Sequence, residues 1–101
     1  MGQSPFFYAT RIGNSNLMKF FLEKNADVNE TDNYKQTPLF YAAREGNVDA
    51  AKILVDYKVN VSHRDLISQT PLFYAAREGK LSMCEFLLEN GADVNEVDLR
   101  K

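Results

Sequence analysis

The ten residues from Thr37 to Gly46 read TPLFYAAREG, and the same ten letters recur from Thr70 to Gly79, 33 positions later. A degenerate copy, SPFFYATRIG, runs from Ser4 to Gly13 and matches at six of the ten places. A fixed period of this length indicates one structural unit stacked on copies of itself. Such an array has no central pocket and presents an extended surface, so the period favours binding over catalysis.

The second half of each unit keeps the same period. The segment LEKNADVN at 22–29 aligns with VDYKVNVS at 55–62 and with LENGADVN at 88–95. A column of aspartates follows in each copy: Asp32, Asp65 and Asp98. We therefore divide the chain into one domain of three repeats, at approximately 2–34, 35–67 and 68–101, the last of which enters a fourth loop.

The composition gives no reason to expect a nucleic-acid or membrane partner. The formal net charge is −2 and the sequence pI is about 5.3, whereas binding to phosphate backbones or anionic lipids needs clustered positive charge. The apolar runs are short, as in Ile53-Leu54-Val55, and fall far below the roughly 20 residues of a membrane-spanning helix. One cysteine, Cys84, allows no internal disulfide, which favours a reducing intracellular setting, cytoplasmic or nuclear.

The opening of each unit predicts a short first helix. Thr37 is a good N-cap, and Pro38 suits the first helical position, where a missing N–H costs nothing. Ala42 and Ala43 then give an apolar face with small side chains, on which a second helix can pack closely. Gly46 should end the helix, because glycine takes the left-handed conformation without strain.

A second helix is expected from about Val48 to Tyr57. Its apolar stripe falls at helical spacing: Val48, Ala51, Leu54 and Val55. The helix should end at a column that holds Asn25, Lys58 and Gly91. A lysine in a left-handed cap costs about 1 kcal/mol or more. We therefore expect local strain or a shifted helix end in the middle unit, and hairpin-like loops at 27–36 and 60–69.

Two helices and a loop at a period of 33, opened by Thr37-Pro38-Leu39, resemble the ankyrin repeat. The resemblance covers about residues 2–99. Further motifs in phase carry it: Ala42-Ala43, Gly46, Gly91-Ala92-Asp93-Val94-Asn95 and the aspartate column. It implies an all-α solenoid of stacked helix-turn-helix units that are joined by hairpin-like loops.

Two columns depart from the family pattern. Phe7, Phe40 and Phe73 stand where the family has a histidine, which ties neighbouring loops by hydrogen bonds. Because phenyl rings can only pack, we expect them to form a hydrophobic ladder between units. Lys35 and Ser68 replace the family's loop glycine, so we expect those loop tips to be looser or differently turned.

The resemblance also implies a binding surface made of loop tips and the exposed side of the first helices. By position it assigns twelve residues to contact with a protein or peptide partner: Asn33, Tyr34, Gln36, Tyr41, Arg44, Glu45, Leu66, Ile67, Gln69, Tyr74, Arg77 and Glu78. The first unit adds Gln3, Tyr8, Arg11 and Ile12. Tyrosine and arginine are frequent hot spots of protein interfaces, which favours this surface.

These groups also have purely structural interpretations. The Arg-Glu pairs at 44–45 and 77–78 fit a solvated face, and Tyr41 and Tyr74 fit half-buried spacers with only their hydroxyls available. Leu66 and Ile67 are the sharpest feature, because an extended chain points adjacent side chains to opposite sides. They predict either an exposed apolar contact site or the packing of one of them against a neighbouring loop.

No residue pattern indicates catalysis, a cofactor or a metal. His63 is the only histidine, and it lies about twenty residues from Cys84 in a different element, so the two cannot form a metal site. Cys84 falls in the predicted core stripe, which favours a buried, inert thiol. The five glycines are scattered as turn residues and form no phosphate-binding loop. We therefore expect a protein that is not an enzyme.

Three functional alternatives stay open beside a monomeric interaction module. The segment could regulate or target a larger multidomain enzyme from which it was excised, it could read modified lysine through aromatic rings, or it could be a designed repeat protein. The ends bear on the first alternative. We expect Thr10 and Ser15 to form a polar N-terminal cap, whereas the last predicted helix has none, so we expect a piece of a longer protein.

Overall fold

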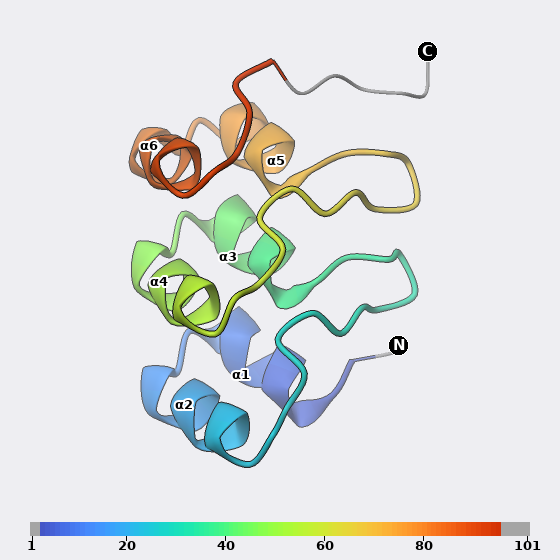
Figure 1. Ribbon diagram of the computed structural model, residues 1–101, viewed down its shortest axis with the longest axis vertical. Helices are drawn as coiled ribbons and strands as arrows, with labels where there is room; N and C mark the ends of the chain where they lie inside the picture. Colours follow the sequence, from blue (N-terminus) through green and yellow to red (C-terminus); the bar gives the residue numbers. More distant parts are fainter. Residues whose placement is uncertain (1–2, 96–101) are drawn as a thin grey trace.

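A computed structural model describes residues 3–95, which form a single-file stack of helix pairs (Figure 1). The helices are α1 Pro5–Ile12, α2 Ser15–Glu23, α3 Pro38–Glu45, α4 Val48–Asp56, α5 Pro71–Arg77 and α6 Leu81–Glu89. We call the pairs α1/α2, α3/α4 and α5/α6 the first, second and third units. No strand occurs within residues 3–95, so the predicted all-α stack is confirmed. Asp98 and the predicted fourth loop lie outside these residues.

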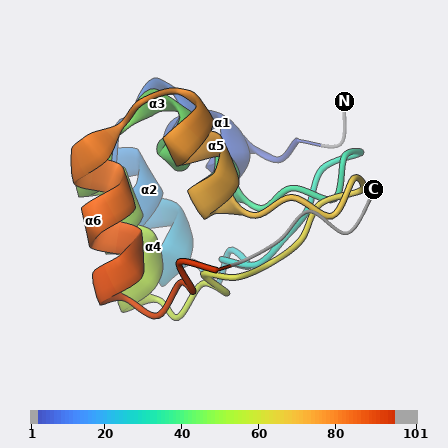
Figure 2. The ribbon, with the colours of Figure 1, turned by 90° about the horizontal axis from the view of Figure 1, so that it is seen from above.

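The units stack in register, and their loops project together to one side of the helices (Figure 2). The first helices α1, α3 and α5 lie in one layer, and the second helices α2, α4 and α6 lie in another. Each helix packs on its equivalent in the neighbouring unit as well as on its partner in the same unit. A feature that repeats in the sequence therefore forms a continuous column along the stack.

The first helix of each unit starts where the sequence predicts, at a Ser/Thr-Pro pair. Ser4 and Thr70 cap α1 and α5, and their hydroxyls accept hydrogen bonds from the amides of Phe7 at 3.2 Å and Phe73 at 3.3 Å. Thr37 holds the same extended N-cap position before α3, but its hydroxyl makes no capping bond. That buried hydroxyl has no hydrogen-bond partner among the described residues, so Thr37 does not cap α3 through its side chain.

The middle unit carries the backbone strain that its lysine predicts. α4 has nine residues, as α2 and α6 do, so its end is not shifted. Lys58 instead takes the left-handed φ of 69° that Asn25 and Gly91 take in their units, at 73° and 106°. The amide of Val59 then reaches back to the carbonyl of Leu54 at 3.1 Å, which closes the helix end.

The loop tips are tight hairpin turns, and our expectation that the lost glycines would loosen them is wrong. Lys35 and Ser68 both take left-handed φ values, 61° and 65°. The amide of Lys35 donates to the carbonyl of Asp32 at 3.0 Å, and the amide of Ser68 donates to that of Asp65 at 2.9 Å. Both turns therefore close without glycine, and the left-handed conformation stores strain in Lys35 and Ser68.

His63 joins the loop between α4 and α5 to the loop between α2 and α3. The ankyrin resemblance gives this role to a histidine in the column that here holds Phe7, Phe40 and Phe73. The Nε2 atom of His63 lies 3.0 Å from the carbonyl oxygen of Lys35, and its ring meets the Phe40 ring edge-on at 6.1 Å. A second bond joins the same loops, from the amide of Leu66 to the carbonyl of Tyr34 at 2.9 Å.

The core lies between the units and between the two helix layers. Ala42 and Ala43 of α3 are buried, as the prediction of a small-residue face requires. Phe7 and Phe40 are fully buried, and each packs edge-on against a tyrosine of the next unit: Phe7 on Tyr41 at 5.4 Å, and Phe40 on Tyr74 at 5.8 Å. The predicted hydrophobic ladder thus holds for Phe7 and Phe40, with a tyrosine of the next unit against each ring, but not for Phe73, which is 38% exposed.

Two predictions about the ends of the stack are wrong. Thr10 is buried, and its hydroxyl donates to the carbonyl of Phe6 at 3.1 Å, so it does not serve as an outer polar cap. The same position of the repeat holds Ala43 in the second unit and Ala76 in the third. Ala43 is buried under the unit that follows it, as Thr10 is, whereas Ala76 is exposed. Cys84 is half-buried and not fully buried, because no described unit covers that side of α6.

Lys58 provides a direct test of the strained helix end. Replacing Lys58 with glycine should raise the free energy of unfolding by about 0.5–1 kcal/mol, because glycine removes the left-handed penalty. Urea denaturation at neutral pH measures this change. As a control, Lys52→Gly in the middle of α4 should lower the free energy of unfolding by about 1 kcal/mol. A destabilised Lys58→Gly variant would contradict the assignment of strain.

Candidate binding surface

Two buried aspartates, Asp32 and Asp65, organise the loops. One carboxylate oxygen of Asp65 accepts hydrogen bonds from the amides of Ile67 at 3.0 Å and Gln69 at 2.9 Å. Asp32 does the same one unit earlier, with amides two and four residues ahead at 2.8 and 3.0 Å. These bonds hold the tight turn and offset the desolvation of a buried carboxylate.

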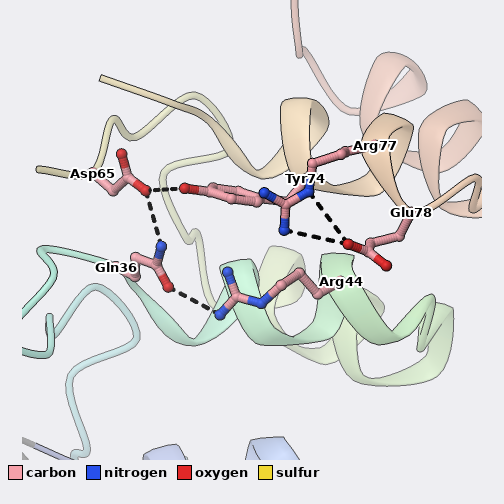
Figure 3. Close-up of polar contacts among 6 residues, drawn as sticks. All are labelled: Gln36, Arg44, Asp65, Tyr74, Arg77 and Glu78. Carbon is pink, nitrogen blue, oxygen red and sulfur yellow. Dashed lines mark hydrogen bonds and ion pairs between the residues drawn. The ribbon is translucent and has the colours of Figure 1, made fainter. Parts of the chain in front are cut away.

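The second carboxylate oxygen of each aspartate joins its loop to the helix that follows the loop, α3 for Asp32 and α5 for Asp65. The Tyr74 hydroxyl donates to Oδ2 of Asp65 at 2.5 Å, and the Tyr41 hydroxyl donates to Asp32. Gln36, from the preceding loop, donates from Nε2 to the same Asp65 oxygen at 2.9 Å (Figure 3). Asp65 therefore links two units at one buried point.

The same glutamine positions an arginine of its own unit. The Arg44 guanidinium donates to Oε1 of Gln36 at 3.0 Å (Figure 3). In the first unit, Arg11 donates to Oε1 of Gln3 at 2.9 Å. Gln3 in turn donates from Nε2 to the Tyr41 hydroxyl at 3.2 Å. Each glutamine thus holds one arginine of its own unit and one polar group of the next.

Arginines and tyrosines alternate in a stacked column along the first helices. The Cζ atom of Arg44 lies 4.8 Å from the ring centroid of Tyr41 and 5.0 Å from that of Tyr74. Arg11 continues the column below, 5.8 Å from Tyr41, and Arg77 continues it above, 5.0 Å from Tyr74. Each such cation–π contact contributes about 0.5–1 kcal/mol at an exposed site, so the column is ordered before any partner arrives.

The network shifts the acidities of its members in opposite directions. Burial raises the pKa of the Asp65 carboxyl, but the hydrogen bonds from Tyr74, Gln36 and two backbone amides outweigh burial and leave that pKa below 3.8. Burial and the hydrogen bond to Asp65 raise the pKa of the Tyr74 phenol to about 12. Burial and Asp32 likewise raise the pKa of Tyr41. Both tyrosines therefore stay neutral donors at physiological pH.

The loop tips expose apolar side chains beside this column. Leu66 and Ile67 are 62% and 44% exposed, so neither packs away against a neighbouring loop. Tyr34, at the tip of the preceding loop, is also exposed, and its carbonyl accepts the bond from the Leu66 amide. These three exposed side chains lie on two loops that the Leu66–Tyr34 backbone bond joins, and we call them together the tip patch.

A family model for ankyrin repeats, in three copies, matches residues 6–98. The chain belongs to the ankyrin repeat family. Ankyrin repeats are generally protein–protein interaction modules, and they are typically non-catalytic. No curated protein matches the chain.

The ankyrin stack places the twelve residues assigned from sequence in three settings. Exposed are Asn33, Tyr34, Glu45, Leu66, Ile67, Arg77 and Glu78. Half-buried are Tyr41 and Arg44, while Gln36, Gln69 and Tyr74 are buried. The three buried side chains offer almost no surface to a partner. Their position between the units gives them a structural role instead.

Two of the structural interpretations fit the geometry of the ankyrin stack. Arg77 and Glu78 form an ion pair at 3.3 Å (Figure 3), and their side chains are 54% and 42% exposed, which fits a solvated face. Tyr41 and Tyr74 act as spacers between units. Their hydroxyls, which the sequence analysis left available to a partner, are occupied by Asp32 and Asp65.

The first unit contributes to a shallow open pocket of about 210 Å³ beside the column. It is lined by Tyr8, Arg11, Ile12, Tyr41 and Glu45. Tyr8 and Ile12 are well exposed there. The pocket thus extends the surface toward the first unit, with an apolar wall and one charge of each sign.

The structural role of the aspartates was not predicted. The column of Asp32 and Asp65 was visible as a repeat, but no chemistry was assigned to it. The available signal was the shared period of four columns, because the glutamine, arginine, aspartate and tyrosine of the network all recur at 33 positions.

The described part of the chain offers no metal centre and no membrane span. No group of three or more histidine, cysteine, aspartate or glutamate side chains is placed to hold a metal within residues 3–95. No helix in the same range is long and apolar enough to cross a membrane.

Asp65 should dominate the acid dependence of stability within this network. Asp65→Asn should lower the free energy of unfolding by about 1–3 kcal/mol at pH 7, because it removes a charged acceptor of four hydrogen bonds. Since the folded pKa is lowered, the stabilisation is present above pH 3.8 and is lost as the pH falls through the folded pKa.

Urea titrations of the wild type and the variant across acidic pH measure this difference, which should shrink as the pH falls. Glu85→Gln, at an exposed site on α6, is the matched control and should change stability by less than about 0.5 kcal/mol. A difference between Asp65→Asn and wild type that stays constant with pH would contradict the ionised network.

Proposed function

We propose that this ankyrin domain binds a protein or peptide through the tip patch and the exposed edge of the arginine–tyrosine column. The observation that supports it most is the exposure of Leu66 and Ile67 at the tip of a tightly held loop. Exposed apolar side chains on a rigid support are favourable contact sites, because little order has to be imposed on binding.

The column supplies the polar half of the proposed surface. Arg44 is held by Gln36 and by two tyrosine rings, so its guanidinium is fixed in place. A guanidinium has five N–H donors, and the bond to Gln36 uses one of them. The two arginines on either side, Arg11 and Arg77, are more exposed. We therefore expect a partner with an apolar segment for the tips and acceptor groups for the arginines.

The geometry of the column disfavours the modified-lysine reader. An aromatic cage needs ring faces that converge on one cation. The ring of Tyr41 already faces Arg11 and Arg44, and that of Tyr74 already faces Arg44 and Arg77. A regulatory or targeting module of a larger enzyme would use the surface proposed above, so identifying the partner decides between the two roles. The free thiol of Cys84 favours an intracellular setting.

The tip patch can be tested with a double substitution. Replacing Leu66 and Ile67 with serine should weaken partner binding at least about tenfold, because it removes the apolar contact and leaves the turn intact. Immobilised wild type and variant would be exposed to a lysate of cells that express the chain. Proteins that the wild type retains and a bare support does not would be purified and titrated against both chains by calorimetry.

The matched control is Tyr57→Ser, which removes an exposed aromatic ring at the end of α4, away from the loop tips. It should bind like the wild type, and all three chains should unfold at similar urea concentrations. Equal affinity of the partner for the wild type and the double variant would remove Leu66 and Ile67 from the site.

A further inference from the structure

Two arginines of the column carry positive charges that no carboxylate within residues 3–95 pairs with. The guanidiniums of Arg11 and Arg44 each donate one hydrogen bond, and in both cases the acceptor is the neutral amide of a glutamine. Neither forms an ion pair with another described residue, whereas Arg77, one unit further along, pairs with Glu78. The column therefore has two cations without a counter-charge, and these are open to the anionic groups of a partner.

Arg77 shows how a carboxylate binds an arginine of this column. Its Nε and one terminal nitrogen both lie 3.3 Å from Oε2 of Glu78, while its Cζ atom stays 5.0 Å from the ring centroid of Tyr74 (Figure 3). Stacking on a tyrosine is therefore compatible with carboxylate binding. A guanidinium has five N–H donors, so Arg44 keeps four of them for a carboxylate after its one bond within residues 3–95.

The surroundings of Arg11 add an apolar contact. Glu45 and Glu78 follow the arginines of the second and third units, but the same position of the first unit holds Ile12, which is 56% exposed. Ile12 and Arg11 line the same shallow pocket. An acidic side chain with an apolar neighbour fits this pocket. Glu45 also lines it and opposes an anion there, so the charge of Glu45 gives a test of the sign of the ligand.

The spacing of the two arginines limits the conformation of the bound segment. Both contact the ring of Tyr41, with Cζ atoms 5.8 Å and 4.8 Å from its centroid, and their helices are neighbours in one layer. Packed helices are about 8–10 Å apart. A polyproline II chain has three residues per turn and rises about 3.1 Å per residue, so its residues i and i+3 share a face at about this spacing.

The other regular conformations fit the two arginines less well. In a β-strand, residues three apart point to opposite faces. An α-helix returns to one face at this distance only after about seven residues, and helices as short as that are marginal in water. A polyproline II segment needs only four residues to reach both arginines and is ordered at a lower entropic cost.

We propose that the segment bound by this ankyrin domain is acidic, with two carboxylates three residues apart in a polyproline II conformation. One carboxylate binds Arg44. The other binds Arg11 and has an apolar neighbour that packs on Ile12. The inference rests on the proposed function and adds to it the charge, the spacing and the conformation of the ligand.

Four blocked peptides test the charge and the spacing against the full 101-residue chain. The matched probe is Leu-Glu-Pro-Pro-Glu-Pro. One control has glutamine in place of both glutamates, a second has the same composition in the order Leu-Glu-Glu-Pro-Pro-Pro, and a third is an alanine-rich helix with glutamates seven residues apart. The matched probe should bind at least about tenfold tighter than each control, because only its two carboxylates reach both arginines in a preformed conformation. Titrations followed on the guanidinium N–H signals by NMR measure these affinities.

Three variants test the residues. Arg44→Gln should weaken the matched probe at least about tenfold, since it removes a bidentate partner. Glu45→Gln should strengthen it by up to about fivefold, because a like charge at the surface is removed. Lys52→Gln, which removes an exposed positive charge from α4 in the other helix layer, is the matched control and should bind like the wild type. Circular dichroism should show all three variants folded.

Equal affinity for the four peptides, tighter binding of the helical peptide, an Arg44→Gln variant that binds like the wild type, or weaker binding by Glu45→Gln would each overturn the proposal. The proposed function has its own readout, the dependence of the native partner on Leu66 and Ile67. It therefore stands if that partner is lost with the double substitution while no acidic peptide binds.

Discussion

Burial of one unit's apolar face by the next unit is the constraint on which this ankyrin structure depends. A pair of helices of seven to nine residues is too small to enclose a core of its own. Phe40, Ala43 and Ala51 are fully buried only because the third unit lies on them. The buried columns repeat at 33 positions, so close packing fixes the register in which one unit lies on the next. The same register aligns the exposed columns of the sequence along the stack.

The buried polar network converts this register into a defined surface. Asp65 fixes its loop through two backbone amides, its own first helix through Tyr74, and the preceding unit through Gln36. An unpaired carboxylate at this depth would be costly, so the network tolerates little displacement of its members. The loop tips and the arginine column are positioned by that requirement, not by contacts of their own.

Structural features that depend on the 33-residue period and on local backbone chemistry could be predicted from the sequence. Proline after a capping residue placed the first helices, and Lys58 in the left-handed helix-end column of Asn25 and Gly91 correctly indicated strain. It was insufficient where a side chain's setting depends on the neighbouring unit. Gln69 and Tyr74 were assigned to the surface because related columns are exposed in the family, yet here they lie in a buried network. Lys35 and Ser68 kept a tight turn because the carboxylates of Asp32 and Asp65, three residues earlier, hold it, and the repeat pattern alone assigned no role to those aspartates.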